Sequence, residues 1–152
     1  MIITLNRALS GALDAFLLSL GVELPLGVAG AARGGPTLPG TWVRLPFAHH
    51  ELHRDGSTAL AVGLSPSATV RLTEAMTGIR AAQQDAELQG DTVSELANIL
   101  AGNVQPLVPG TIGLRLPAKI DADQAANGAG LRFDCGRDGV IEVRVLGDLA
   151  AA

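Results

Sequence analysis

Residues 91–105 read D-T-V-S-E-L-A-N-I-L-A-G-N-V-Q, and their pattern predicts the helix around which the rest of the chain is arranged. At about 100° per residue, four apolar residues fall within one narrow arc, which predicts a face buried in the core. These residues are Val93, Leu96, Leu100 and Val104. Pro106 and Pro109 follow directly, and proline disfavours helix at the residue before it. We therefore expect the helix to end near residue 105.

The opposite side of this helix carries polar residues and a glycine. They are Asp91, Glu95, Asn98 and Gly102, with Ser94 beside them. Glu95 and Asn98 are three residues apart, so their side chains are neighbours. No lysine or arginine lies in this stretch, and glycine inside a helix costs about 1 kcal/mol relative to alanine. The pattern predicts a docking face rather than an enclosed pocket, with an ordinary solvated helix face as the alternative.

The N-terminal part of the chain predicts two helices and three strands. Leucines at helical spacing predict a first helix, and Ser65 or Ser67 with Pro66 predicts the start of a second one that runs to about Arg80. The expected elements are helix 5–20, edge strand 22–31, strand 41–47, strand 58–64 and helix 65–80. Residues 81–90 are expected to form a loop or a frayed helix.

The C-terminal part predicts strands only. Residues 112–120 are expected to form one strand, residues 122–130 a polar flexible loop, and residues 131–146 a β-hairpin with its turn at residues 136–139. This order of elements predicts an α+β fold: a mostly antiparallel sheet with two or three long helices packed on one face. The whole chain, 1–152, is expected to be a single domain.

Composition narrows the function classes. Hydrophobic residues make up 47% of the chain and charged residues 17%, so we expect an ordered aliphatic core. The net charge is −4, the basic residues are scattered, and aromatic residues are 3%, which argues against the basic and aromatic surfaces typical of nucleic-acid binding. No secretory signal or membrane-spanning stretch is visible, so a cytoplasmic protein with no membrane partner is expected. The single cysteine, Cys135, is interpreted as a reduced structural thiol.

The helix at 91–103 resembles the signature helix of the CheX/CheC phosphatases of bacterial chemotaxis. The similar features are an acidic residue, Glu-x-x-Asn at 95–98, and a small residue with Gly and Asn at 101–103. Leu114-Arg115-Leu116-Pro117 is similar to the strand that follows this helix in the family. The buried stretch 60–64 and the Ser-Pro helix start upstream also resemble it.

This resemblance implies a function within two-component signalling. It implies that the partner is the phosphorylated form of a CheY-like receiver domain and that the reaction is hydrolysis of its aspartyl phosphate. By position, Asn98 would orient the attacking water and Glu95 would pair with the receiver's lysine, while Asp91, Ser94 and Gly102 would contact the partner. No cofactor of its own is implied, because the Mg²⁺ would be held by the receiver.

The resemblance also leaves alternative functions open. Only one Glu-x-x-Asn is present, as in CheX-type members, and the first helix reads D-A-F-L around Asp14 instead. The FliM/FliY switch proteins resemble the same family, so a non-catalytic adaptor or scaffold is the second hypothesis. A structural oligomer is the third, because the apolar hairpin 130–146 is predicted to be able to pair edge to edge. The resemblance itself implies a homodimer.

Other motifs carry weaker signals. His49, His50, Glu51 and His53 lack the H-E-x-x-H spacing and are interpreted as an exposed loop, with adventitious metal binding as the alternative. The glycines at 27, 30, 34 and 35 match no phosphate-binding motif and are interpreted as turns. Ser65 and Ser67 are interpreted as helix-capping residues.

Overall fold

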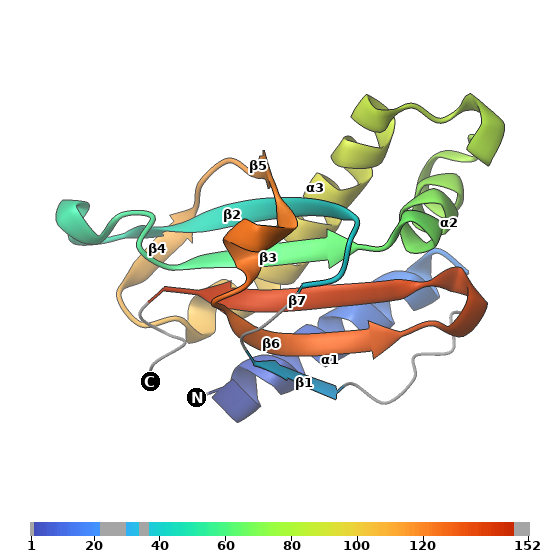
Figure 1. Cartoon of the computed structure of the whole chain (residues 1–152). Coiled ribbons are helices and arrows are strands. Elements are labelled where there is room, and N and C mark those ends of the chain that lie inside the picture. The colour runs from blue at the N-terminus through green and yellow to red at the C-terminus, as the bar shows by residue number, and fades with distance from the viewer. Residues whose placement is uncertain (1, 22–29, 34–36, 148–152) are drawn as a thin grey trace.

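The computed structural model describes residues 2–21, 30–33 and 37–147. The described residues form three α-helices, α1 (Ile2–Ser19), α2 (Pro66–Thr77) and α3 (Ala86–Val104). The strands are β1 (Gly30–Arg33), β2 (Thr41–His49), β3 (Ala59–Leu64), β4 (Thr111–Leu114), β5 (Ala118–Ile120), β6 (Ala129–Asp134) and β7 (Val140–Leu146). Figure 1 shows the strands as one twisted layer with α1 and α3 behind it and α2 at one end.

The strands form one sheet in the order β1-β6-β7-β3-β2-β4, and every pair is antiparallel. β5 also pairs with β2. It lies along residues 42–44 of β2, whereas β4 lies along residues 47–49, so both border the same edge. The predicted fold class, an antiparallel sheet with helices on one face, is confirmed.

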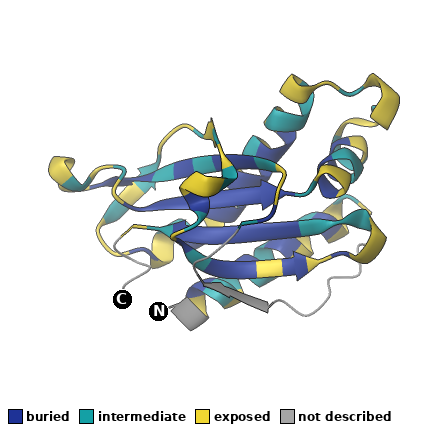
Figure 2. Ribbon diagram, in the orientation of Figure 1, coloured by how far each residue is buried: buried dark blue, intermediate teal, exposed yellow. Residues whose placement is uncertain are grey.

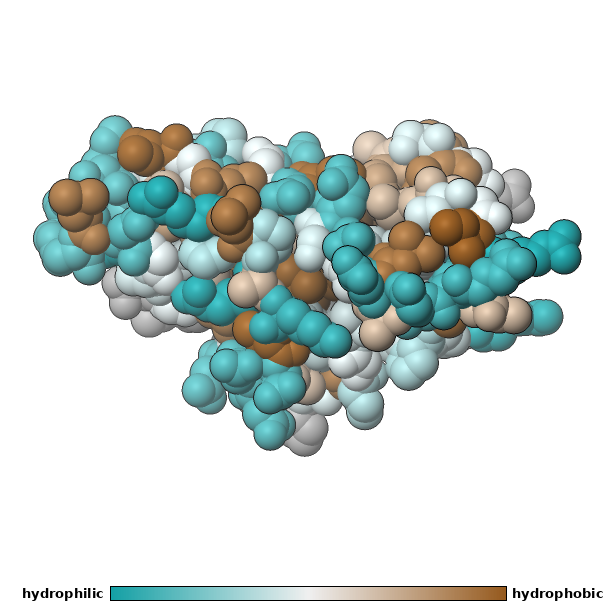
Figure 3. Space-filling model, turned by 90° about the horizontal axis from the view of Figure 1, so that it is seen from above, coloured by the Kyte–Doolittle hydropathy of each residue, from teal (hydrophilic) through white to brown (hydrophobic). Residues whose placement is uncertain are grey.

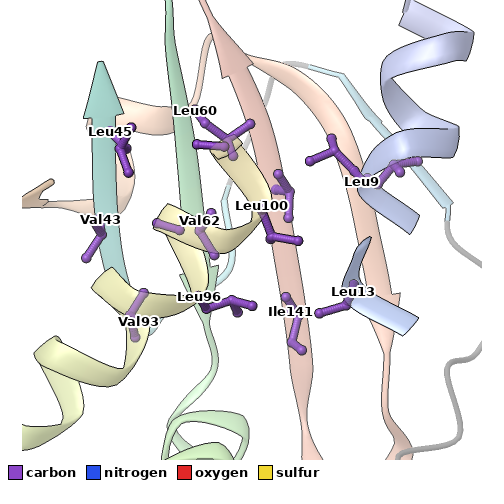
Figure 4. Packing of buried hydrophobic residues seen from close by; sticks show 14 of the residues in the cluster. Leu9, Leu13, Val43, Leu45, Leu60, Val62, Val93, Leu96, Leu100 and Ile141 are labelled. Carbon is purple, nitrogen blue, oxygen red and sulfur yellow. The ribbon is translucent and has the colours of Figure 1, made fainter. Parts of the chain in front are cut away.

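The main core lies between the sheet and the helices α1 and α3. Alternate residues of β2, β3 and β7 point toward these helices, as Figure 4 shows for the labelled side chains. The helices contribute Leu5, Leu9, Leu13 and Leu17 of α1 and Val93, Leu96, Leu100 and Val104 of α3. Burying each such side chain stabilises the fold by about 1.5–3 kcal/mol. Figure 2 shows the result, with central strands that are buried along most of their length.

The other face of the sheet is covered by two irregular segments, residues 37–40 and 121–128. Trp42 is fully buried there and donates its indole N–H to the carbonyl oxygen of Leu38 at 2.9 Å. Glu142 and Arg144 are also buried on this face and form an ion pair of 3.2 Å. Arg144 also donates to the carbonyl oxygens of Ala126 and Gly128. Both faces of the sheet are therefore packed, which explains why all six residues of β3 are buried.

The first two helices agree with the sequence prediction apart from their ends. α1 begins at Ile2 instead of residue 5. α2 is capped by Ser65, whose hydroxyl accepts from the backbone N–H of Ala68 at 3.4 Å, as predicted. It ends at Thr77 instead of Arg80, because Gly78 adopts a left-handed conformation with φ of 74° and closes the helix.

The predicted strand 112–120 is wrong as a continuous element. Pairing with β2 continues through Arg115, whose N–H donates to the carbonyl oxygen of Pro46 at 2.8 Å. Two residues later Pro117 has no N–H to donate, and the chain leaves the sheet before it returns as β5. In the predicted loop 122–130, residues 122–125 form a short helical turn that packs on the second face, and Ala129 already begins β6.

The predicted C-terminal hairpin is confirmed as β6 and β7, but its predicted edge-to-edge pairing is wrong. β1 lies along residues 129–132 of β6, and β3 lies along β7, so the hairpin is inside the sheet. A homodimer formed in another way stays a prediction. The predicted strand 22–31 lies outside the described residues except for its last two, which belong to the edge strand β1.

Among the described helices, none is long and apolar enough to cross a membrane.

Candidate functional site

The candidate site is the outward face of α3, and the first turn of this helix is set by two acidic residues. The side chain of Asp85 accepts a hydrogen bond from the backbone N–H of Leu88 at 2.8 Å, which caps the helix. Glu87 lies in the first turn, where the helix dipole favours negative charge. The helix therefore begins at Ala86, and the prediction of a loop or frayed helix is wrong for residues 86–90. The predicted C-terminal end is correct to within one residue.

One side of α3 is buried as predicted. Val93, Leu96, Leu100 and Val104 are each exposed by 1% or less. Thr92 is buried too, and its hydroxyl accepts a hydrogen bond from the hydroxyl of Thr73 on α2 at 2.9 Å. These contacts fix the rotation of α3 about its own axis, and with it the direction in which the opposite face points.

The opposite face carries the residues singled out in the sequence. Asp91, Glu95, Asn98 and Gly102 are exposed, and Ser94 is half-buried beside them. Within the described part of the chain, the side chains of Glu95 and Asn98 take part in no hydrogen bond or ion pair. The nearby Asn103 differs, because its amide donates to the carbonyl oxygen of Ile99 at 2.8 Å. The carboxylate and amide of the Glu95–Asn98 pair are thus available to a partner.

Gly102 leaves the surface open beside this pair. A Cβ atom built at this position would meet no other atom within 4 Å, and its φ is not positive. Neither packing nor backbone conformation therefore requires a glycine here, although it weakens the helix by about 1 kcal/mol. Close approach of another molecule gives a reason for it.

Negative charge dominates the face. Glu87, Asp91 and Glu95 follow one another at intervals of four residues, and α3 contains no lysine or arginine. Like charges at this spacing destabilise a helix by about 0.2–0.5 kcal/mol per pair. A cationic group of a partner would be attracted to each of these carboxylates and would reduce the repulsion between them. Sequence reasoning missed Glu87 because residues 81–90 were predicted to be a loop, although Asp85 is a recognisable helix-capping residue.

The histidines do not form a second site. His49 ends β2 and is buried, so its prediction as part of an exposed loop is wrong, whereas His50 and His53 are exposed. His53 lies 3.4 Å from the carboxylate of Glu51. Among the described residues, no group of three or more His, Cys, Asp or Glu side chains is placed to hold a metal ion. Cys135 is buried, and burial raises the pKa of its thiol to about 11.

Comparison with known proteins identifies the fold. No protein-family model matches the sequence, and no curated protein matches it. Solved structures do match: the chemotaxis protein CheX from Vibrio vulnificus superposes with a TM-score of 0.70 at 11% identity, covering 94% of this chain and 98% of that one. The chain therefore has the CheX/CheC-like fold.

Two further structures extend the comparison. The CheX–CheY–BeF3–Mg²⁺ complex from Borrelia burgdorferi contains a chain that matches with a TM-score of 0.61 at 17% identity, covering 92% of this chain and 95% of that one. A chain of the FliM–SpeE complex from H. pylori matches with a TM-score of 0.56 at 12% identity, covering 96% and 83%. The fold is thus similar to that of a chain in the CheX–CheY complex and to that of a chain in a complex that contains FliM.

Proposed function

We propose that this protein has a chemotaxis-related role as a phosphatase that hydrolyses the aspartyl phosphate of a CheY-like receiver domain. The observation that carries the proposal is the exposed Glu95–Asn98 pair, in which neither side chain has a described partner. The likeness of the fold to a CheX protein solved with CheY supports it. A receiver would dock on the face formed by Asp91, Ser94 and Gly102 around this pair. Such a reaction would place the protein in the cytoplasm.

The proposed reaction requires no covalent bond between this chain and the phosphate. The oxygen of a water molecule forms a bond to phosphorus while the bond between phosphorus and the aspartate oxygen breaks. Inorganic phosphate and the receiver's carboxylate are the products, and both protons of the water end on phosphate. An aspartyl phosphate is already reactive, so placing the water in line contributes most of the acceleration.

Asn98 suits the placing of water. Its amide both donates and accepts hydrogen bonds and does not change its protonation state near neutral pH. Glu95 suits a cationic partner group, because hydrogen bonds between a carboxylate and an ammonium are strengthened by charge. In the proposal, Glu95 pairs with the receiver's lysine and fixes the distance at which Asn98 enters the receiver's site. The Mg²⁺ would be held by the receiver, so no residue of this chain is assigned to a metal.

A non-catalytic adaptor is the second candidate. The likeness to a chain of the FliM–SpeE complex favours it, because it extends the structural comparison beyond CheX proteins. An adaptor would use the same acidic face to bind a phosphorylated receiver without turnover. The two functions differ in the need for Asn98, since binding requires complementary charge but hydrolysis requires the oriented water.

The experiment is to follow phosphate loss from phosphorylated CheY-type receivers in Mg²⁺ with wild type, Asn98→Ala and Glu95→Ala. Asn103→Ala is the matched control, because it removes the same amide from the same helix at a position already bonded to the backbone. The phosphatase predicts acceleration by wild type and by Asn103→Ala, and loss of that acceleration in Asn98→Ala. Binding that depends on Glu95 without any acceleration would instead make this protein an adaptor.

A further inference from the structure

A pocket of about 290 Å³ lies between the first half of α3 and the strand β5. Figure 1 shows these two elements at the same edge of the molecule. The residues that line the pocket include Val43, Glu87, Gly90, Asp91, Ser94 and Lys119. Asp91 and Ser94 also belong to the proposed docking face, so a receiver bound over Glu95 and Asn98 would cover the pocket. The inference therefore rests on the proposed function and adds a second contact to it.

Gly90 gives the pocket its depth. It lies inside α3, its φ is not positive, and a Cβ atom built there would meet nothing within 4 Å. As at Gly102, the protein's own packing does not require the glycine, although it costs the helix about 1 kcal/mol. Both glycines leave the helix open on the side that a partner would approach.

The charges of the pocket favour a cation. Glu87 and Asp91 are exposed, stand one turn apart on the α3 wall, and form no ion pair within the described residues. Lys119 lies on the opposite wall and is not within 4 Å of either carboxylate. Exposed Ala86 and half-buried Gly90 supply the apolar surface of the α3 wall, because Val43 lines the pocket with only 1% of its surface exposed. Two carboxylates beside this small apolar surface match a side chain with an aliphatic stem and a cationic end.

We propose that this pocket receives an arginine or lysine side chain of the docked receiver, and that Glu87 and Asp91 bind its cationic group. The pocket lies at the flank of the catalytic pair, so the contact selects receivers that carry a basic residue at the matching distance from their phosphorylation site. Lys119 repels the same cation and thereby restricts it to the α3 wall.

Binding to a CheY-type receiver activated with BeF3⁻ and Mg²⁺ tests this assignment. Glu87→Gln with Asp91→Asn is expected to weaken binding about 10-fold or more at low salt, with a smaller effect at high salt. Lys119→Glu is expected to strengthen binding. Gly90→Phe, which fills open space, is expected to weaken binding while the thermal unfolding midpoint is kept. Asp14→Asn is the matched control for Glu87→Gln alone or Asp91→Asn alone, because it removes one exposed carboxylate from α1 instead.

Three results would overturn the inference. One is unchanged affinity in both the Glu87→Gln/Asp91→Asn variant and the Gly90→Phe variant. The second is a loss of affinity in Asp14→Asn equal to that in Glu87→Gln or Asp91→Asn alone, which would make the effect one of net charge. The third is weaker binding by Lys119→Glu. If acceleration of phosphate loss by wild type still depends on Asn98, the proposed function stands without the pocket. If wild type neither binds the receiver nor accelerates phosphate loss, the proposed function and the assignment of the pocket are both wrong.

Discussion

The hydroxyl of Thr73 on α2 donates a 2.9 Å hydrogen bond to the hydroxyl of Thr92 on α3, and both side chains are buried. Thr92 in turn donates to the carbonyl oxygen of Leu88 at 3.2 Å. The Thr73–Thr92 bond joins the two helices at the residue that follows Asp91 in the sequence. The orientation of the candidate site therefore depends on a polar contact inside the core as well as on apolar packing.

Thr92→Val is expected to destabilise the protein by about 1–3 kcal/mol, because the Thr73 hydroxyl loses its acceptor in a buried place. The double variant Thr73→Val/Thr92→Val removes both hydroxyls and is expected to be more stable than Thr92→Val alone. Urea unfolding of the four proteins in this cycle measures the coupling. Additive effects of the two substitutions would contradict the account.

Substitution of two glycines is expected to have opposite effects on stability. Gly102→Ala adds a methyl group in open space and removes a helix-breaking residue, so it is expected to stabilise the protein by up to about 1 kcal/mol. The same methyl group stands on the proposed docking face and is expected to slow the proposed hydrolysis of the receiver's phosphate. Gly63→Ala is expected to destabilise the protein strongly, because the new Cβ would collide with the ring of Trp42, the cross-strand partner. The thermal unfolding midpoint is expected to rise in Gly102→Ala and to fall in Gly63→Ala. A higher midpoint in Gly63→Ala would contradict the close packing of residue 63 against Trp42.

Cys135 is expected to be unreactive in the folded protein. Burial raises the pKa of its thiol from 9.0 to about 11, so the folded state keeps the proton while the unfolded chain releases it near pH 9. Stability from this group is therefore full below pH 9 and declines as the pH rises toward about 11. Alkylation by iodoacetamide at pH 8 is expected to be slow in buffer and fast in guanidinium chloride. Equal rates in the two conditions would place the thiol at the surface.

Asp55 is expected to titrate below its ordinary range. The hydrogen bond from Arg115 lowers the pKa of its carboxyl group from 3.8, with help from the backbone N–H of His49. A lowered pKa means that the contribution to stability is present above the unfolded value and is lost as the pH falls through the folded value. NMR titration of the Asp55 carboxyl group is expected to show this, and Arg115→Ala is expected to raise the midpoint. An unchanged midpoint in Arg115→Ala would contradict the assignment.

The sequence was most informative where one side of an element is apolar and the other polar. The periodicity of residues 91–105 predicted which residues of α3 are buried and which are exposed. The start of α2 was predicted from Ser65 or Ser67 with Pro66, and Ser65 is the residue that caps it. The start of α3 was missed because residues 86–90 include Gly90 and lack an apolar stripe, so the local signals were the capping residue Asp85 and the acidic Glu87 in the first turn.

Features that depend on distant contacts could not be predicted. Side chains alternate along β7, so Glu142 and Arg144 point to the opposite face of the sheet from Ile141 and Val143. No local sequence pattern shows that residues 121–128 cover this opposite face. The pocket beside α3 is likewise formed by segments far apart in the chain, since only the pairing of β5 with β2 places Lys119 on the wall opposite Glu87 and Asp91. Large apolar side chains remain exposed at Leu52, Ile112 and Leu116. Figure 3 shows hydrophobic patches at the end of the molecule that carries the β2–β3 hairpin and β4.

The most direct test of the central claim is the rate of phosphate loss from a phosphorylated CheY-type receiver at saturating concentrations of wild type and of Asn98→Ala. The account predicts that wild type accelerates the loss and that Asn98→Ala binds the activated receiver but loses about 100-fold or more of the acceleration, because the water is no longer held in line. An Asn98→Ala protein that hydrolyses the phosphate as fast as wild type would contradict the role of this amide.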